Sequence, residues 1–376
     1  MNGFAGLRIA IVGPLPPPAS SSAAAGGMAN QTRQLAELLA AGRAAVEVVP
    51  TNAAHRPAWA ARLPFVRAIV RLVPYLVALW RAAGHSDVFH VMANSGWAWH
   101  LFAAPAIWIG WLRRVPVVVN YRGGEAVGFL ARAPWRVRFT MRRAARLVVP
   151  SAFLQAIFEG HGMPAAVLPN VIDLSRFRPR DAAAARAPGA HVIATRNLEP
   201  IYDNATALRA FALLHASRPH ARFTLAGSGP EAASLRALAA ELGVQGVVRF
   251  TGALDRDAIA ALYREADACV NASVADNTPN ALLEALASGV PVVSTSVGGI
   301  PHLVEHEKSA LLAAPRDPAA LAKALTRVLD DPALRHRLVQ AGLQQAQRHT
   351  WQQVAPCLAA TYRTVLADAA AAPAQA

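Results

Sequence analysis

Residues 266–299 (ADACVNASVADNTPNALLEALASGVPVVSTSVGG) constrain the fold more tightly than any other stretch of this chain. Two apolar runs of strand length bracket a segment with clear helix boundaries. Thr278 suits the N-cap, Pro279 the first helical position, and Gly289 the position just past the helix end. The order strand, helix, strand defines a βαβ unit, which predicts a parallel sheet.

Parallel sheets bind ligands at the carboxyl ends of their strands. In this unit that edge holds Asp276 in the loop and Glu284 about one turn into the helix, beside the backbone amides of 280–282, which are expected to be free. Carboxylates can bind sugar hydroxyls, and a helix N-terminus can hold a phosphate or sugar oxygen. These residues alone favour a ligand site no more than a structural interpretation. In the structural interpretation, Asp276 is an ordinary loop acid and Glu284 a solvated helix residue.

The length of 376 residues is too great for one core and suits two domains. Strand-like and helix-like segments alternate in both halves, and the apolar periodicity lapses between them. We therefore predict an α/β fold with two Rossmann-like parallel-sheet domains facing a central cleft. The expected boundaries are an N-terminal domain at 1–170, a linker at 171–190, a second domain at 191–350, a helix at 351–367 that packs back on the first domain, and a disordered tail at 368–376.

The formal charge of +14 lies almost entirely in the first half. Residues 1–185 contain 20 Arg and 7 Asp or Glu, whereas residues 186–376 contain 17 basic and 16 acidic residues. This asymmetry indicates an anionic partner, either a membrane, a nucleic acid or a phosphorylated substrate. No nucleic-acid motif accompanies it, so we expect no nucleic-acid partner.

The stretch 56–84 places Arg62, Arg67, Arg71 and Arg81 among Trp, Phe, Leu and Val, and six more arginines follow between 132 and 146. Such a pattern suits the surface of an anionic membrane, although a helix packed on the sheet would look similar. The apolar runs are too short to span a bilayer, no secretory signal is visible, and two cysteines fit a reducing compartment. We expect a cytoplasmic protein, peripheral on the inner face of the plasma membrane.

Six segments in fixed order carry a resemblance to a known family. They are LPNVIDLSRF (168–177), ATRNLEP (194–200), FTLAGSGPE (223–231), VVRFTGAL (247–254), NASVADNTPNALLEALASGVPVVSTSVGGIPHLV (271–304) and SALLAAP (309–315). Together they resemble family 4 of the retaining nucleotide-sugar glycosyltransferases (glycosyltransferase group 1), whose fold is GT-B. The resemblance implies that Glu284 holds the nucleotide ribose, Asp276 the donor sugar and Arg196 the donor diphosphate.

The remaining residues expected at the donor site come from glycine-containing turns and from the start of the predicted helix. They are Gly26, Gly27, Asn197, Gly227, Ser228, Gly252, Asn277, Thr278, Pro279, Asn280, Ala281 and Leu282. Arg196 suits its implied role because a guanidinium fork matches two phosphate oxygens.

Two departures from the family pattern stand out. The family usually has a Lys five or six residues after the arginine, where this chain has Ile201 and Tyr202. Many relatives have a His after the strand corresponding to 116–120, where this chain has Arg122. We therefore list Arg122 and His90, which ends another predicted strand, as further catalytic candidates, although a lone His is more often structural.

The D-x-D sequence Asp255-Arg256-Asp257 has the form that binds a metal in the other glycosyltransferase fold. Here it opens a predicted helix, where acids complement the helix dipole, so we expect no metal and no cofactor. A glycosidase that uses Asp276 and Glu284 as acid and base is disfavoured, because Arg196 would keep both carboxylates ionised.

The resemblance thus implies a metal-independent hexosyltransferase, a retaining enzyme that uses a nucleoside-diphosphate sugar. Its acceptor would be a glycan or a lipid-linked molecule in cell-surface polysaccharide or glycolipid synthesis. A nucleotide-sugar epimerase of the same fold and a non-catalytic binding or scaffold protein are the alternatives.

Overall fold

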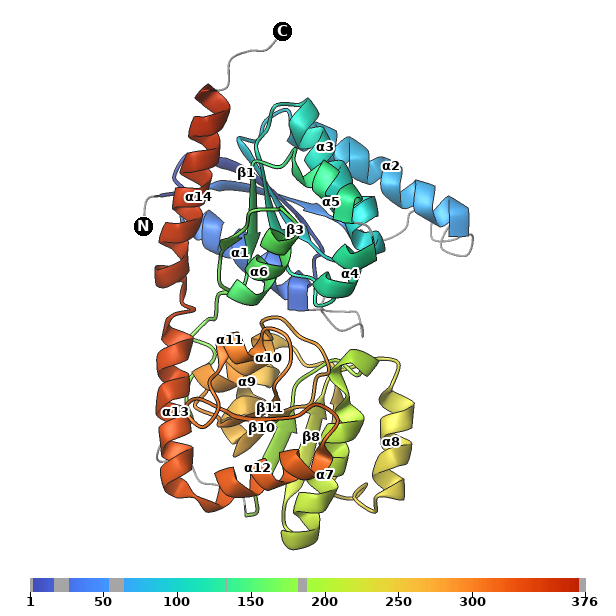
Figure 1. The fold of residues 1–376 in the computed structure, drawn as a ribbon, viewed down its shortest axis with the longest axis vertical. Helices are drawn as coiled ribbons and strands as arrows, with labels where there is room; N and C mark the ends of the chain where they lie inside the picture. The colour runs from blue at the N-terminus through green and yellow to red at the C-terminus, as the bar shows by residue number, and fades with distance from the viewer. Residues whose placement is uncertain (1–2, 17–26, 54–63, 133, 182–187, 372–376) are drawn as a thin grey trace. The chain divides into compact units, whose positions relative to one another are not determined.

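The computed structural model describes residues 3–16, 27–53, 64–132, 134–181 and 188–371, with the side chains of 64–70 excepted. The chain forms two compact units (Figure 1). The described residues within 1–16, 25–169 and 354–376 make the first unit, and those within 170–353 make the second. The predicted α/β class with two parallel sheets is confirmed.

The first unit is built on a six-stranded parallel sheet of order β2-β1-β3-β4-β5-β6. Its strands are β1 (Arg8–Gly13), β2 (Ala45–Pro50), β3 (Val88–Ala93), β4 (Val117–Tyr121), β5 (Arg146–Val149) and β6 (Ala166–Val167). Its helices are α1 (Gly27–Ala41), α2 (Pro64–Ala82), the π-helical turn η2 (Trp99–Ala103), α3 (Ala104–Leu112), α4 (Ala126–Arg132), α5 (Pro134–Met141), α6 (Ala152–Gly160) and, from Val354 onward, α14 (Trp351–Ala371).

The second unit repeats the plan with the strand order β12-β11-β10-β7-β8-β9, again parallel throughout. Its strands are β7 (His191–Ala194), β8 (Arg222–Ala226), β9 (Val248–Gly252), β10 (Ala268–Asn271), β11 (Val292–Thr295) and β12 (Leu311–Ala313). Its helices are the 3-10 turn η3 (Pro200–Tyr202), α7 (Asn204–Ser217), α8 (Ala232–Glu241), α9 (Arg256–Glu265), α10 (Asn280–Ala287), α11 (Ile300–Leu303), α12 (Pro318–Asp330) and α13 (Pro332–Gln347).

Helices cover both faces of the second sheet. Val192 and Ala194 of β7 enter one hydrophobic cluster with α7 and α12, while Ile193 enters another with α9 and α10. A strand buried on both faces reads as a continuous apolar run, which is why these short strands were recognisable in the sequence.

Two expected boundaries need correction, and one strand was missed. The first part of the predicted linker is not a solvated connection, because Ile172 and Phe177 are buried in the core of the second unit. The tail predicted to begin at 368 continues the last helix as far as Ala371. Finally, Leu311–Ala313 is an edge strand that was not predicted.

Candidate active site

The carboxyl edge of the second sheet brings Arg196, Asp276 and Glu284 together. Arg196 follows β7 and Asp276 lies in the loop after β10, and these two strands are hydrogen-bonded neighbours. The Arg196 Nη2 donates to Asp276 Oδ2 at 2.5 Å. Only 13% of the Arg196 side chain and 12% of the Asp276 side chain are exposed, so this ion pair is largely removed from water.

Arg196 is held in place by an aromatic ring as well as by the ion pair. Its guanidinium lies 4.0 Å from the centroid of the Tyr202 ring. Its Nε is buried and has no hydrogen-bond partner among the described residues. Burial alone would lower the pKa of Arg196, but Asp276 and the neighbouring groups outweigh it and raise the pKa above its ordinary value. The site therefore contains a fixed positive charge with hydrogen-bond donors left for an anion.

Tyr202 occupies one of the two positions at which the family usually places its lysine. The ring stacks on Arg196, and the neighbouring Ile201 carbonyl accepts a hydrogen bond from the Val274 amide at 2.9 Å. The loop is thus tied to the one that holds Asp276, and its aromatic side chain orients the arginine instead of adding a second cation.

The Asp276 loop depends on two glycines that the sequence analysis did not single out. The Gly299 amide donates to the Asp276 carbonyl at 2.9 Å. Gly298 has a φ of +52°, and a Cβ there would lie 2.1 Å from the same carbonyl oxygen. A Cβ on Gly299 would lie 2.0 Å from the carbonyl oxygen of Asn277. Any larger residue at either position would displace the Asp276 loop.

Glu284 points into a buried cluster around Tyr263, another residue that the sequence analysis missed. The Tyr263 hydroxyl lies 3.2 Å from Glu284 Oε2, 2.9 Å from the Ala281 carbonyl and 2.5 Å from Thr195 Oγ1. The Tyr263 side chain is fully buried. In the sequence it occupies an ordinary core position of α9, so nothing there distinguishes it from a packing aromatic.

Burial raises the pKa of Glu284 from 4.5 to about 7, while Tyr263, Arg256 and Arg196 act in the opposite direction. Arg196 therefore does not keep this carboxyl fully ionised, and near pH 7 its protonated and ionised forms are both populated. Desolvation wins because Arg196 already forms its close ion pair with Asp276.

Replacing Glu284 by Gln should stabilise the ligand-free protein at pH 8 but not at pH 5. A raised carboxyl pKa means that native stability is lost as the pH rises from the unfolded value of 4.5 through about 7. A shift of this size corresponds to roughly 3 kcal/mol. Thermal unfolding of both proteins between pH 5 and 8 measures the difference. Equal unfolding temperatures at pH 8 would mean that Glu284 is solvated and ordinary.

The helix that carries Glu284 begins one residue later than predicted. Pro279 is the N-cap of α10 and Thr278 makes no capping bond, since its Oγ1 is buried without a partner among the described residues. Asn170 supports this end, because its Nδ2 donates to the Thr278 carbonyl at 3.0 Å and to Asn280 Oδ1 at 2.8 Å. The Leu282 amide, expected to be free, donates to the Pro279 carbonyl at 3.1 Å.

The glycine-containing turn after β8 lies against the backbone of Arg196. A Cβ on Gly227 would lie 2.2 Å from the Arg196 carbonyl oxygen, and the Leu198 amide donates to the Ser228 carbonyl at 3.0 Å. Gly227 also forms an isolated bridge with Gly252. The candidates Asn197, Gly227, Ser228 and Gly252 therefore lie around the segment that bears Arg196.

In the first unit, Arg122 lies at the carboxyl end of β4. Its Nε donates to Asn120 Oδ1 at 3.0 Å and its Nη1 to Gln31 Oε1 at 2.7 Å. Gln31 belongs to α1, which begins at Gly27, so Arg122 and the predicted glycine turn share one sheet edge. Gly26 lies outside the described residues.

The placement of His90 does not support a catalytic role. The side chain is fully buried, with Nε2 at 3.0 Å from Asn120 Nδ2 and Nδ1 at 2.8 Å from the Tyr362 hydroxyl. Burial and the nearby Arg122 lower its pKa to about 3, so the imidazole is neutral at physiological pH. His90 is a structural link between β3, β4 and α14 within the first unit.

The D-x-D sequence lies at the start of α9, where the sequence analysis expected acids to complement the helix dipole. Asp255 is the N-cap of α9, and its Oδ1 accepts from the amides of Asp257 and Ala258 at 3.0 and 2.8 Å. The Asp257 carboxylate pairs with Arg176.

The chain matches known families over both halves. The profile described as "Glycosyltransferase Family 4" matches residues 25–176, and the one described as "Glycosyl transferases group 1" matches residues 185–345. Curated relatives include a D-inositol 3-phosphate glycosyltransferase of Streptomyces avermitilis, 35% identical over 54% of this chain and 47% of that protein. A glycogen synthase of Mycobacterium tuberculosis is 32% identical over 70% of this chain and 66% of that protein. The match thus spans about half the length of the first relative.

Solved structures share the fold. Sucrose-phosphate synthase from Thermosynechococcus elongatus superposes with a TM-score of 0.76 at 22% identity, covering 96% of this chain and 100% of the other. Anabaena HepE in complex with UDP gives 0.71 at 18% identity, covering 95% and 100%. With two consecutive family profiles and this shared architecture, the protein belongs to the group 1, family 4 glycosyltransferases of the GT-B fold.

Proposed function

We propose that this chain is a retaining glycosyltransferase that moves a hexose-type sugar from a nucleoside-diphosphate sugar to a glycan or lipid-linked acceptor. The observation that supports it is the convergence of Arg196, Asp276 and Glu284 at one sheet edge. A cation for the diphosphate and two carboxylates for hydroxyl groups are what a nucleotide sugar requires. The proposed setting is cell-surface polysaccharide or glycolipid synthesis at the cytoplasmic side of the membrane.

In the proposed reaction, the bond between the anomeric carbon and the diphosphate oxygen breaks, and the nucleoside diphosphate leaves with the electron pair. The acceptor oxygen bonds to the same carbon from the same face, and its proton passes to an oxygen of the leaving phosphate. Arg196 stabilises the charge that develops on the diphosphate, and Asp276 orients the sugar. Because Arg196 supplies the positive charge, we propose that the reaction needs no metal ion.

Incubation with UDP-, GDP- and ADP-glucose tests this function. One of them should raise the unfolding temperature by binding the native state and should yield a glycosylated product with a retained anomeric configuration in EDTA. Inversion of that configuration or a requirement for a divalent metal would contradict the corresponding part of the proposal.

A second candidate, a nucleotide-sugar-binding protein without catalysis, is favoured by one observation. Ile201 and Tyr202 stand where the family usually has a lysine, so neither position carries a positive charge. Binding of a sugar nucleotide without turnover in the presence of many acceptors would favour this candidate.

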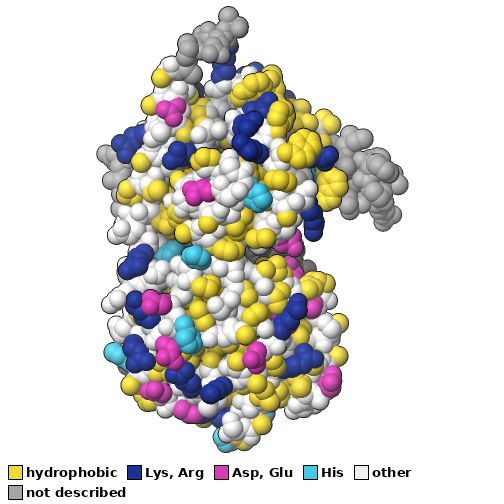
Figure 2. Space-filling model, in the orientation of Figure 1, with side chains coloured by type: hydrophobic (Ala, Val, Ile, Leu, Met, Phe, Trp, Pro, Cys, Tyr) yellow, Lys and Arg dark blue, Asp and Glu magenta, His cyan; other side chains and the backbone are white. Residues whose placement is uncertain are grey.

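We further propose that the first unit binds an anionic membrane through exposed apolar and aromatic side chains, which we call the aromatic surface (Figure 2). It consists of large apolar side chains on α2, α3, α4 and α5: Val77, Trp80, Trp111, Leu112, Val127, Trp135 and Phe139. Arginines lie over three of its rings, with Arg113 4.6 Å from Trp80, Arg136 5.1 Å from Trp135 and Arg143 4.2 Å from Phe139. Exposed aromatics with interleaved cations suit the boundary between headgroups and acyl chains.

The structure does not place all the arginines that the sequence suggested for membrane binding on this surface. Arg71 is bound within the first unit, because its Nη2 donates to the Thr51 carbonyl at 2.5 Å and its guanidinium lies 5.0 Å from the Phe102 ring centroid. Arg62 and the side chain of Arg67 lie outside the described residues. Within the described part of the chain, none of the helices has the length and apolar character needed to cross a bilayer.

Replacing Leu112 and Trp135 together by Ser should weaken binding to anionic vesicles at least about 10-fold, because both side chains would lose burial in the bilayer. They are 60% and 67% exposed, so the native fold should tolerate the change. Co-sedimentation with phosphatidylserine vesicles measures the effect. Leu213→Ser is the matched control, since Leu213 is equally apolar and 52% exposed but belongs to α7 of the second unit. Equal binding by the double variant would exclude the aromatic surface.

A further inference from the structure

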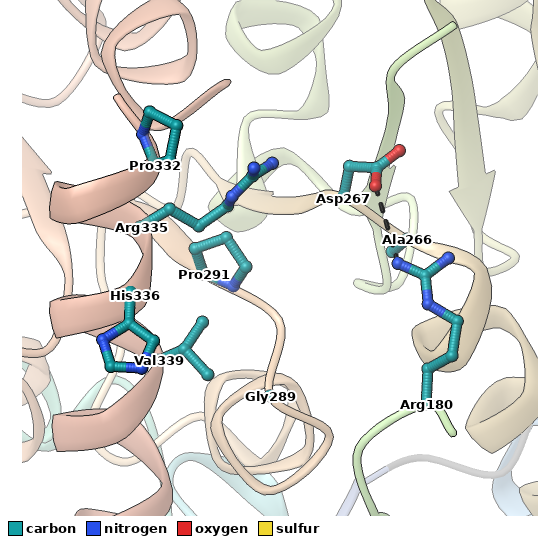
Figure 3. Close-up of a pocket in the computed structure, with 9 residues that line it drawn as sticks. All are labelled: Arg180, Ala266, Asp267, Gly289, Pro291, Pro332, Arg335, His336 and Val339. Carbon is teal, nitrogen blue, oxygen red and sulfur yellow. Dashed lines mark ion pairs between the residues drawn. The ribbon is translucent and has the colours of Figure 1, made fainter. Parts of the chain in front are cut away.

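The second unit contains a pocket at the sheet edge opposite to the candidate active site. Asp267 directly precedes β10 and Pro291 directly precedes β11, so the pocket lies at the amino ends of these strands (Figure 3). Arg196 and Asp276 lie beyond the carboxyl ends of β7 and β10. The cavity volume is about 340 Å³, which falls in the range of small-molecule sites.

One wall of this pocket is a single face of α13. Pro332, Arg335, His336 and Val339 recur at the spacing of one helical face. Figure 3 shows Arg335 extending from α13 toward the opposite wall, where Arg180 and Asp267 lie. The pocket is therefore enclosed by cationic side chains on two sides, and Pro291 and Val339 provide apolar surface.

The charges of the pocket are not balanced. Both carboxylate oxygens of Asp267 already have partners within the protein. Its Oδ2 accepts a hydrogen bond from the His191 amide at 2.9 Å, and its Oδ1 lies 3.7 Å from Arg180 Nη2. The guanidinium of Arg335 makes no hydrogen bond or ion pair with any residue in the described part of the chain. Asp267 balances the charge of Arg180, but no acid in the pocket balances the half-buried Arg335. The pocket therefore has an excess positive charge.

We propose that this pocket binds a phosphate monoester of a small polar molecule, such as a sugar phosphate. The Arg335 fork matches the oxygens of a phosphate group, and Arg180 adds a second cation for the dianion. The cavity leaves room for a sugar-sized group against Pro291 and Val339. This site is separate from the donor site and does not require the proposed transferase activity.

Titration calorimetry of the full chain with inorganic phosphate and with glucose 6-phosphate tests the site. The wild type should bind both, with tighter binding of the sugar phosphate because it also contacts the apolar wall. Arg335→Ala should weaken binding about 10-fold or more, since a charge-assisted contact is lost. Val339→Glu, which places a negative charge in the cavity, should have a comparable effect, so the test does not depend on one variant folding.

Two controls distinguish this pocket from other anion sites. Arg337→Ala removes an exposed arginine of the same helix and should leave the affinity unchanged. Arg196→Ala removes the arginine of the candidate donor site, so any phosphate held at that site is lost and the sugar-phosphate binding that remains belongs to the pocket. Loss of binding in Arg196→Ala, unchanged binding in both pocket variants, or no binding up to about 10 mM would overturn the proposal.

Discussion

Arg196→Ala is expected to lower kcat at least about 100-fold, because a contact that strengthens as the diphosphate leaves typically contributes on the order of 3 kcal/mol. Arg196 is the cation that pairs with Asp276 and stacks on Tyr202, and the lysine common in the family is missing. Arg196→Lys should recover only part of the rate, since an ammonium group cannot reproduce the planar fork or its stacking on the ring. Steady-state kinetics with the donor that binds gives the comparison.

The control for this experiment is Arg209→Ala, which removes an exposed arginine from α7. A rate within a few-fold of wild type for Arg196→Ala would refute the assigned role. Ile201→Lys and Tyr202→Lys restore the family pattern in two ways, but the second also removes the ring that orients Arg196. We therefore expect Ile201→Lys to remain active and Tyr202→Lys to be slower. If these variants and the wild type bind a sugar nucleotide and none turns it over, the binding-protein alternative is favoured.

Glu284→Ala is expected to abolish detectable transfer and to weaken nucleotide binding at least about 100-fold. Two carboxylate oxygens that accept from two ribose hydroxyls form charge-assisted bonds worth roughly 1.5–3 kcal/mol each. The variant should still fold, because removing a partly buried acid whose pKa is raised to about 7 relieves a cost at neutral pH. Calorimetric binding of the nucleoside diphosphate and product analysis measure the two effects separately.

The same acid makes nucleotide binding depend on pH in a defined direction. Below about pH 7 the Glu284 carboxyl is protonated in the ligand-free protein, so it accepts fewer hydrogen bonds and affinity should fall with falling pH. Glu241→Ala, which removes an acid from the exposed end of α8, should change neither affinity nor its pH dependence. Tight binding by Glu284→Ala would show that the ribose is held elsewhere.

The sequence predicted the sheets and the position of the site because both depend on local patterns. Short apolar runs separated by Gly, Pro and polar residues define strands buried on two faces, and the acids after them lie at the carboxyl edge. The segment around Ile172 and Phe177 was misjudged for the same reason. Its apolar residues are isolated between Pro and charged residues, and only the tertiary structure shows that they are buried.

The buried polar residues could not be assigned from the sequence because their partners are distant. His90 was predicted to end a strand, but it lies inside β3 (Val88–Ala93), and its hydrogen-bond partner Tyr362 is far away in the sequence. Tyr263 shows the reverse case, since an ordinary core position places its hydroxyl beside Glu284. The raised pKa of Glu284 could not be predicted either, because it results from burial in the folded protein and not from neighbouring residues in the sequence.

The return of α14 to the first unit has a consequence for biosynthesis. Tyr362 contacts Phe4 edge-to-face at a centroid distance of 6.0 Å and bonds to His90, so the first unit is completed by residues that follow the whole second unit in the chain. During translation the second unit has its whole sequence available before the first unit does. A fragment that ends near residue 170 would lack the partner of His90 and expose the apolar residues that α14 covers, which makes it a poor choice for separate expression.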